Sequence, residues 1–367
     1  MDSEPYGTDV ISVPETKTVP YGNGKPEQRS FERPKYAVAS LFAGIGGIDL
    51  GFKQAGAEIV YANEIDRYAV ETYRHAFGGA PYLDPGDIYE KHVPKDRRID
   101  IVVGGFPCQA FSVAGFRKGF EDDRGVLYTQ VLRIVNETCP KAVFLENVKN
   151  LKNHDNGRTY SIIKESIEGA GYVVDERVLN SLEYGNVPQN RERIYVVGFR
   201  EDVPGSGRSR VMDAFEFPEP VGLTDTIFKI IDRSVKQDER YYYPHAHKIY
   251  PILDGAMDDP DTVYQWRRNY VRKNMSGVCP TLTAAMGGGG HNVPIIRDEY
   301  DIRKLTPQEC LLIQGFPKDY TFPENMADSH KYKQVGNSVT VPVVKRIAEN
   351  MIGAMRTAEE GSAPSTN

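Results

Sequence analysis

The chain has 367 residues, of which 40% are hydrophobic and 26% are charged, and its formal net charge is −6. This composition is typical of a globular protein with enough chain for a sizeable core, and the acidic balance disfavours a protein that coats nucleic acid nonspecifically. It does not exclude DNA binding, because phosphate contacts depend on local clusters of Lys and Arg.

The sequence carries no signal for export or membrane insertion. No run of about 18 apolar residues is present, so no membrane contact is expected. The N-terminus lacks the basic and apolar segments of a signal peptide. The four cysteines form no C-x-x-C pair, which favours a reduced, intracellular protein. His245 and His247 have no cysteine beside them, so no metal site is expected.

Strand and helix signals alternate between two polar ends, 1–34 and 357–367, whose composition predicts flexible tails. Apolar runs that predict strands occur at 37–42, 58–62, 101–103, 142–145, 172–174 and 194–199. Helix-length stretches separate some of them, at 67–77, 126–138 and 159–170. The alternation over 35–200 predicts an α/β domain with a doubly wound, mostly parallel sheet, whose ligands sit at the carboxyl ends of the strands.

The regular pattern breaks over 201–301, a stretch rich in Pro, Gly, Tyr and Asp that predicts a second, smaller, irregular domain. The pattern returns over 302–356, where Thr306 and Glu309 have the spacing of a capping box at a helix start. A final amphipathic helix is expected at about 341–355.

A glycine-rich turn follows the first predicted strand. Its residues are Phe42, Ala43, Gly44, Ile45, Gly46 and Gly47. Glycines at such a turn let the backbone approach a ligand closely. Glu64 ends the second strand, where a carboxylate can accept both hydroxyl protons of a ribose, and Asp87 and Ile88 follow on the side expected for adenine. These features favour an adenosine-containing cofactor without distinguishing NAD from S-adenosylmethionine.

A cysteine loop follows the apolar run at 101–103. The run Gly104-Gly105-Phe106-Pro107-Cys108-Gln109 places Cys108 at the carboxyl edge of the predicted sheet, where substrates bind. A free cysteine is usually buried, as we expect for Cys139 and Cys310, but a Pro-Cys-Gln turn after two glycines disfavours that role for Cys108. The loop is long and contains glycine, as in loops that close over a substrate.

Glu146 directly follows the apolar run at 142–145. Burial at such a position raises the pKa of a carboxyl group and favours its protonated form. A cysteine facing a proton-donating Glu is unusual, since a cysteine hydrolase would use a histidine base, and no histidine falls at a predicted strand end. A hydrolase is therefore the least favoured interpretation.

Several motifs occur in the order typical of the cytosine carbon-5 DNA methyltransferases of bacterial restriction–modification systems, which the sequence resembles over about 36–350 apart from the irregular region. The matching segments are 42–47, Glu64, Asp87, Phe106-Pro107-Cys108-Gln109, Glu146-Asn147-Val148, Gln189-Asn190-Arg191-Glu192-Arg193, Gln314-Gly315-Phe316-Pro317 and Gln334-Val335-Gly336-Asn337-Ser338-Val339. Pro280-Thr281-Leu282-Thr283 resembles the short Thr-Leu element at the end of the family's recognition domain. Ile65 departs from the pattern, because many members carry there an aromatic residue that stacks on adenine.

The resemblance implies a Rossmann-like catalytic domain formed by 35–200 and 302–356, whose last helix returns beside the first strand, with 201–301 inserted as a target-recognition domain. It also implies S-adenosylmethionine as the cofactor. The residues that would bind it are 42–47, Glu64, Ile65, Asp87, Ile88, Pro107, Asn337 and Ser338.

The resemblance also implies a mechanism. Carbon 5 of cytosine is a poor nucleophile, and addition of the Cys108 thiolate to carbon 6 turns the ring into an enamine-like species that can attack a methyl donor. Glu146 would protonate or hydrogen-bond ring nitrogen 3, and Arg193 would hold the carbonyl oxygen of the base. Arg191 would help to hold the catalytic loop or the backbone.

The target cytosine must leave the duplex stack for this reaction. The loop that begins at Cys108 is the candidate for closing behind the flipped base. Within 201–301, basic residues interleave with aromatic ones, which suits a nucleic-acid surface. The candidate DNA contacts are Gln109, Ser112, Arg124, Arg267, Arg268 and Arg272.

Two other interpretations stay open: a transfer-RNA cytosine-5 methyltransferase and a catalytically silent DNA-binding relative. The inserted region of about 100 residues favours a sequence-reading DNA enzyme, and the intact Cys108, Glu146 and Arg193 disfavour the silent relative. The expected partner is duplex DNA. The protein is expected in the cytoplasm of a prokaryote, where it would act at the nucleoid. A cognate restriction endonuclease in the same host and a monomeric state complete these expectations.

Overall fold

The computed structural model describes residues 35–107, 127–288 and 292–361. The predicted tail at 1–34 lies outside these residues, as do the end of the second predicted tail and four candidate site residues. Those four residues are Cys108, Gln109, Ser112 and Arg124.

Within the described residues, the main sheet has seven strands in the order β3-β2-β1-β4-β5-β8-β6. These strands are β1 Ala37–Leu41, β2 Glu58–Glu64, β3 Leu83–Pro85, β4 Ile101–Gly104, β5 Ala142–Val148, β6 Tyr172–Asn180 and β8 Glu192–Arg200. Strands β1 to β5 are parallel, and β8 is antiparallel to both β5 and β6. The predicted doubly wound, mostly parallel sheet is confirmed. The strand order reverses between β1 and β4, the place where such sheets bind ligands.

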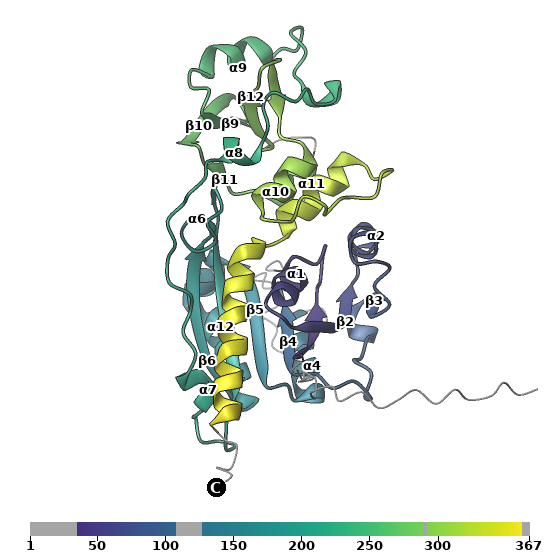
Figure 1. Cartoon of the computed structure of the whole chain (residues 1–367), viewed down its shortest axis with the longest axis vertical. Helices are drawn as coiled ribbons and strands as arrows, with labels where there is room; N and C mark the ends of the chain where they lie inside the picture. Colours follow the sequence, from purple (N-terminus) through teal and green to yellow (C-terminus); the bar gives the residue numbers. More distant parts are fainter. Residues whose placement is uncertain (1–34, 108–126, 289–291, 362–367) are drawn as a thin grey trace, which may run out of the picture. The chain divides into compact units, whose positions relative to one another are not determined.

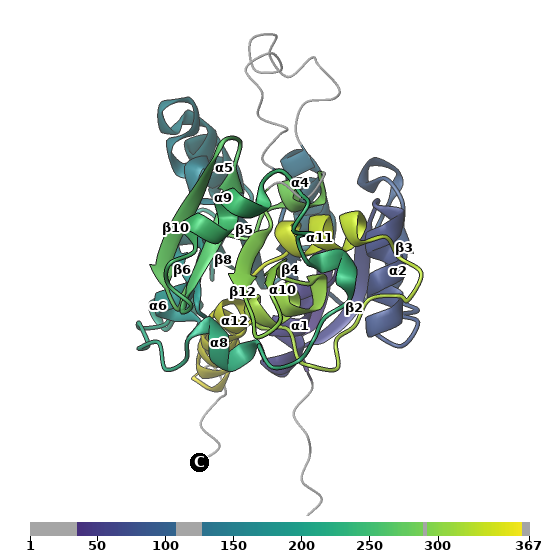
Figure 2. The same ribbon diagram turned by 90° about the horizontal axis from the view of Figure 1, so that it is seen from above.

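Helices cover both faces of the main sheet (Figure 1). The long ones are α1 Gly47–Gln54, α2 Arg67–Ala76, α4 Leu127–Thr138, α5 Arg158–Gly169 and α12 Val341–Glu360. On one face, α1 and α12 pack through Phe52 and Met351, and on the other α4 and α5 pack through Val131 and Ile163. Strands β2 and β3 lie with α2 at one edge of the sheet, and β6 lies at the other (Figure 2).

Helix α12 packs beside α1, the helix that follows β1. It does not end near Met355 but continues to Glu360, so the assignment of 357–360 to a tail is wrong. The last turn is held by Glu359, whose carboxylate accepts a hydrogen bond from the Tyr36 hydroxyl at 2.9 Å and pairs with Lys141 at 2.5 Å. These partners are far away in sequence, and the local composition carries no sign of them.

The region expected to be irregular contains an antiparallel sheet with the order β10-β9-β12-β13. Its strands are β9 Thr262–Arg267, β10 Tyr270–Ser276, β12 Pro294–Arg297 and β13 Ile302–Lys304. One face packs under α9 Tyr250–Ala256 through Tyr264 and Ile295, and the other packs on α10 Pro307–Ile313 through Val263 and Ile296. The capping box at the start of α10 is confirmed.

Both ends of this region differ from the predicted 201–301. The last strand of the small sheet falls after residue 301. At the other end, Phe215 and Phe217 belong to the core beneath α12, and the Glu216 carbonyl accepts a hydrogen bond from Asn350 at 2.9 Å. The first 20 or so residues after 200 therefore pack with the main sheet.

The remaining elements complete the described part of the chain. They are η1 Ile88–Glu90, η4 Lys149–Gly157, α6 Ser181–Tyr184, β7 Gln189–Asn190, α7 Arg210–Asp213, α8 Ile227–Ile230, η5 Glu239–Tyr241, β11 Cys279–Pro280, η6 Ala284–Gly287 and α11 Asp328–Asn337. Across the described ranges, no helix is both long and apolar enough to cross a membrane.

Candidate active site

A cavity of about 750 Å3 lies at the carboxyl ends of β1, β2, β4 and β5. It brings together segments that are far apart in sequence: the glycine-rich turn, the end of β2, the start of the cysteine loop, the end of β5 and the end of α11. Every described residue of the predicted cofactor site lines it, except Gly46. Glu146, Arg191 and Arg193 line the same cavity.

The glycine-rich turn has a backbone that few sequences can adopt. Phe42, Gly44 and Gly46 have φ values of 55°, 57° and 78°, in the left-handed region that glycine tolerates best. A Cβ on Gly47 would lie 2.6 Å from Ser338 Oγ. The first turn of α1 therefore touches the end of α11, which brings Ser338 to the glycine-rich turn as the resemblance implies.

Glu64 is fixed by three backbone N–H groups. Its Oε2 accepts from Gly44 at 2.7 Å, and its Oε1 accepts from Ile65 at 2.8 Å and from Asp66 at 2.7 Å. Burial raises the pKa of this carboxyl group, while the three hydrogen bonds oppose the rise. These three hydrogen bonds hold the carboxylate in one orientation at the cavity wall.

The next wall of the cavity comes from two neighbouring segments. Asp87 caps η1 by accepting from the Tyr89 N–H at 3.1 Å, and Ile88 is buried behind it. Ile65, at the carboxyl end of β2, is 65% exposed although it is large and apolar. An exposed apolar side chain at a cavity edge leaves a surface on which a flat ligand can lie.

Glu146 and Arg193 form a buried ion pair at the ends of neighbouring strands β5 and β8. Arg193 Nε lies 3.1 Å from Glu146 Oε1, and both side chains are close to nine-tenths buried. Burial raises the pKa of Glu146, and the positive charges of Arg193 and Arg191 reduce that rise. The carboxyl group therefore keeps a proton to higher pH than an ordinary Glu, as the sequence predicts.

The start of the cysteine loop is fastened to the same place. The Asn147 side chain donates a hydrogen bond to the Phe106 carbonyl at 2.8 Å. A Cβ on Gly105 would lie 3.3 Å from Glu146 Oε2, so glycine keeps the loop close to the carboxyl group. Pro107 lines the cavity next to these residues, and the chain enters Cys108 from this point.

Arg191 is fully buried and hydrogen-bonds to backbone carbonyls rather than to an acid. It donates to Leu282 O at 2.6 Å, to Gly336 O at 3.3 Å and to Ser338 O. Burial lowers its pKa to about 9, which still leaves the guanidinium charged at neutral pH. These contacts tie the Thr-Leu element and the end of α11 to β8, which fits the expectation that Arg191 holds the backbone.

Two of the three candidate DNA contacts in the small sheet lie on one face of it. Cross-strand pairing places Arg267 opposite Tyr270, and Gln265 opposite Arg272, so these side chains share a face. Arg267 also donates to Asn292 Oδ1 at 2.9 Å. Arg268 is separate, at the exposed hairpin turn with a φ of 55°.

One cavity residue had no signal in the sequence. Lys333 of α11 lines the cavity and pairs with Asp66 at 3.0 Å. A single Lys in a polar helix is normally a solvated surface residue, and only the fold brings it to the cavity.

The fold is that of α/β enzymes which bind a nucleotide-like ligand at a glycine-rich turn. Sequence comparison defines the family more closely. The family model described as C-5 cytosine-specific DNA methylase matches residues 36–353, and the chain belongs to this family. It is therefore a DNA (cytosine-5) methyltransferase.

Two relatives illustrate the match. The type II methyltransferase M.Bsp6I from Bacillus sp. (strain RFL6) is 50% identical over 321 residues, which cover 87% of this chain and 99% of that protein. The type II methyltransferase M.HhaI from Haemophilus parahaemolyticus is 39% identical over 324 residues, which cover 85% of this chain and 92% of that protein.

Solved structures support the fold. DNMT2 from Spodoptera frugiperda superposes with a TM-score of 0.67 at 22% identity, covering 87% of this chain and all of that one. A putative DNA modification methyltransferase encoded within an Escherichia coli prophage gives 0.61 at 20% identity, with 88% and 100% covered.

Proposed function

We propose that this enzyme transfers a methyl group from S-adenosylmethionine to carbon 5 of one cytosine in a short, specific duplex DNA sequence. The observation that carries the proposal is the Glu146–Arg193 pair, buried in the cavity that the glycine-rich turn and Glu64 also line. The type II methyltransferases to which the chain is similar support a restriction–modification setting. Action as a monomer in a prokaryotic cytoplasm, with a cognate endonuclease in the same host, belongs to the same proposal.

The residues present fit this cofactor. Gly44 has open space where a Cβ would project, its nearest neighbour being 4.0 Å away, and Glu64 stands beside it with a fixed carboxylate suited to a ribose diol. Asp87 and Ile88 would hold the adenine edge, and Ser338 would close the methionine end. When bound, S-adenosylmethionine supplies an electrophilic methyl group.

Cys108 is the proposed nucleophile. Its thiolate forms a bond to carbon 6 of a flipped cytosine, which moves electron density to carbon 5. Carbon 5 then takes the methyl group. Loss of the carbon 5 proton expels the Cys108 sulfur and restores the aromatic ring. Water can take up the carbon 5 proton.

Glu146 and Arg193 are proposed to act on the polar edge of the base. A protonated Glu146 donates to ring nitrogen 3, which makes carbon 6 more electrophilic when the thiolate adds. Arg193 stabilises the charge that develops on the carbonyl oxygen. Their contact at 3.1 Å keeps both groups oriented before the base arrives.

We also propose that the target-recognition domain runs from about 222 to 305, since the chain before it packs with the main sheet and β13 ends it. Its recognition face carries Arg267, Arg272 and Gln265, side chains that can read base edges or hold phosphates. The opposite face, which carries Lys273, packs under α9.

Arg267→Ala should weaken binding to target DNA by about tenfold and reduce the slope of log affinity against log salt by about 1 if the side chain contacts a phosphate. Fluorescence anisotropy at several salt concentrations measures both values. Lys273→Ala is the matched control, because Lys273 is on the other face and pairs with Asp258 at 2.8 Å. Equal affinities of the two variants and the wild type for target DNA would show that Arg267 does not contact DNA.

Ile65→Trp should bind S-adenosylmethionine about 2–10-fold more tightly than the wild type, because a stacked aromatic pair contributes about 0.5–1.5 kcal/mol. Isothermal titration calorimetry measures the change, with Ile65→Val as the control that keeps an aliphatic side chain. A weaker or unchanged affinity of the Trp variant would mean that adenine does not lie against residue 65.

The test of the proposed function is bisulfite sequencing of a plasmid from cells that express this protein, with Cys108→Ser expressed alongside. Protection of cytosines in one short sequence by the wild type alone supports the proposal and identifies the target. If no plasmid cytosine is protected but transfer RNA is methylated at cytosine, the substrate is RNA. Failure on both nucleic acids leaves a catalytically silent DNA-binding relative.

A further inference from the structure

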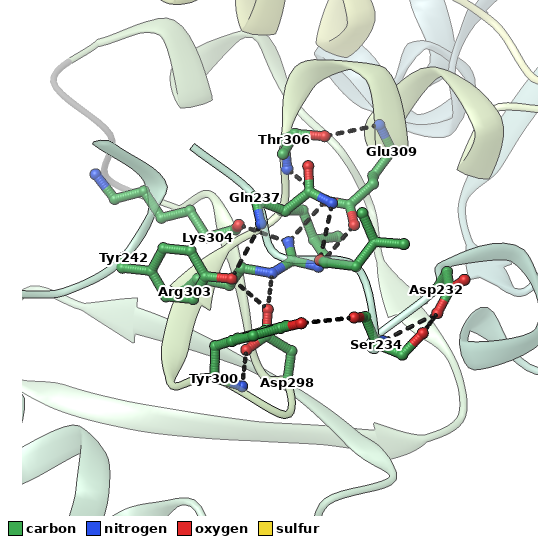
Figure 3. Close-up of polar contacts among 12 residues, drawn as sticks. Asp232, Ser234, Gln237, Tyr242, Asp298, Tyr300, Arg303, Lys304, Thr306 and Glu309 are labelled. Carbon is green, nitrogen blue, oxygen red and sulfur yellow. Dashed lines mark hydrogen bonds and ion pairs between the residues drawn. The ribbon is translucent and has the colours of Figure 1, made fainter. Parts of the chain in front are cut away.

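Arg303 is fully buried where the small sheet meets α10, and it forms its ion pairs there (Figure 3). Its Nε donates to Asp298 Oδ2 at 2.5 Å. Its two Nη atoms donate to the two carboxylate oxygens of Glu309, each at 2.8 Å. A guanidinium held by two carboxylates in this way has one allowed orientation, because the planar fork must match both acceptors.

The two carboxylates each belong to a different segment. Asp298 lies in the turn between β12 and β13, where it also accepts from the Tyr242 hydroxyl at 2.8 Å and from the N–H groups of Tyr300 and Asp301 at 2.9 Å. Glu309 lies in the first turn of α10. Through these two carboxylates Arg303 links three separate pieces of chain: the β12–β13 turn, the segment around Tyr242, which is bonded to Asp298, and α10.

Glu309 makes this joint continuous with the start of α10. Its Oε2 accepts from the Thr306 N–H at 2.7 Å, while its own N–H donates to Thr306 Oγ1 at 3.1 Å. The carboxylate that caps the helix is therefore the same one that binds Arg303. A rotation of the small sheet about β13 would break the ion pair and the cap together.

The other end of α10 reaches the wall of the cavity. Gln314 directly follows α10. Its side chain donates to the carbonyl of Val335 in α11 at 3.0 Å and accepts from the Gln189 side chain at 3.1 Å. The end of α11 lines the cavity, and Arg191 holds the carbonyl of Gly336 there. An unbroken set of directional hydrogen bonds therefore runs from the small sheet through α10 to the cavity.

A buried ion cluster contributes little net stability compared with apolar residues of the same size, since desolvation offsets the attraction between the charges. What it supplies is a fixed geometry.

On the small sheet, Arg303 is on the face that carries Val263 and Ile296, and this is also the face of Arg272 and Gln265.

We propose that Arg303 is a positioning residue which holds the recognition face at one fixed orientation to the cavity, so that the enzyme discriminates its target from sequences that differ by one base pair. This inference rests on the proposed function, because it takes the small sheet as the reader of DNA sequence. Arg303 touches neither the base nor the methyl donor, and its effect is on the ratio between correct and incorrect sites.

The decisive variant is the neutral triple Arg303→Met, Asp298→Asn and Glu309→Gln, which removes all three charges while the amide oxygens still accept the backbone hydrogen bonds. The measured value is kcat/KM for the target duplex divided by kcat/KM for duplexes with one altered base pair. Arg303→Lys keeps the charge but loses the two-pronged contact with Glu309. Arg297→Met is the matched control, because Arg297 belongs to the same sheet and the variant removes its ion pair with Asp254 of α9 at 2.7 Å.

We expect the triple variant to lose discrimination by about tenfold or more, the size of a single base-pair preference. Arg303→Lys should lose part of it and Arg297→Met none, and the Kd for S-adenosylmethionine should change by less than about twofold in all three. A folded triple variant with wild-type discrimination overturns the proposal, even if its melting temperature falls. If the triple does not fold, wild-type discrimination by Arg303→Lys overturns it. A wild-type enzyme without sequence preference would instead refute the proposed function, and this inference with it.

Discussion

Glu146→Gln should slow methyl transfer to cytosine by about 10²–10⁴-fold, the range typical of a lost general acid. The amide has nearly the same shape and can still hydrogen-bond, but it cannot give a proton to ring nitrogen 3. The effect is expected on kcat, because the carboxyl group is needed when the thiolate adds rather than when the cofactor binds. Burial raises the pKa of Glu146, so the wild type starts with more of the protonated form than an exposed Glu would have.

Single-turnover methyl transfer to target duplex measures this change, and calorimetry with S-adenosylmethionine checks that the cofactor site is intact. Glu192→Gln is the matched control, because Glu192 precedes Arg193 on β8 but its side chain is 40% exposed and pairs with Lys149. A loss below about tenfold for Glu146→Gln would show that Glu146 orients Arg193 rather than transferring a proton.

The main sheet could be predicted because its strands are buried on both faces and therefore appear as short apolar runs. The run at 101–103 became β4, and the run at 142–145 became the first part of β5. Strand ends were less predictable. β5 extends through Glu146 and Asn147 because antiparallel pairing with β8 supplies hydrogen bonds that the apolar pattern does not reveal.

The small sheet could not be predicted in the same way. β10 is an edge strand, and most of its side chains are exposed on both faces, so no alternation of apolar and polar residues marks it. A charged residue in a strand usually faces solvent, but Arg303 is fully buried between Asp298 and Glu309. The partners that make such burial possible are set by the fold.

Residues of the candidate site could be predicted where they come at the end of an apolar run that forms a strand, as with Glu64 and Glu146. They were less predictable where a role depends on contacts between distant segments. The resemblance gives Arg191 the role of holding the catalytic loop or the backbone, but only the structure identifies the three backbone carbonyls to which it is bonded. No sequence pattern indicates Lys333, because its partner Asp66 is 267 positions away.

One buried acid beneath the glycine-rich turn is outside the proposed chemistry. Asp49, in the first turn of α1, is fully buried and accepts hydrogen bonds from the Ser40 and Tyr73 hydroxyls, both at 2.5 Å. Burial raises its pKa from 3.8 to about 6, although the two hydroxyls and the charge of Lys53 oppose the rise. The buried Tyr82 hydroxyl lies near the Tyr73 hydroxyl.

Asp49→Asn should be more stable than the wild type by about 1–3 kcal/mol at about pH 8, because one pKa unit corresponds to about 1.4 kcal/mol and the neutral amide avoids the buried charge. Between about pH 4 and 6 the folded wild type holds a proton on Asp49 that the unfolded chain has lost. The stability that Asp49 contributes therefore falls as pH rises through this window. The amide NH2 can donate to the Tyr73 oxygen, which frees the Tyr73 hydroxyl to donate to another acceptor.

Urea unfolding of both proteins across this pH range measures the effect as a difference, so that groups shared by the two proteins cancel. The stability of the variant relative to the wild type should rise from pH 4 to 6 and then stay constant. Asp100→Asn is the control, since that buried side chain contacts Arg98 at 2.7 Å and the Ala37 N–H at 3.0 Å, and the substitution should lower stability by removing the contact with Arg98. A difference for Asp49→Asn that does not change with pH would mean that Asp49 stays ionised in the folded protein and that the two hydroxyls fully offset its burial.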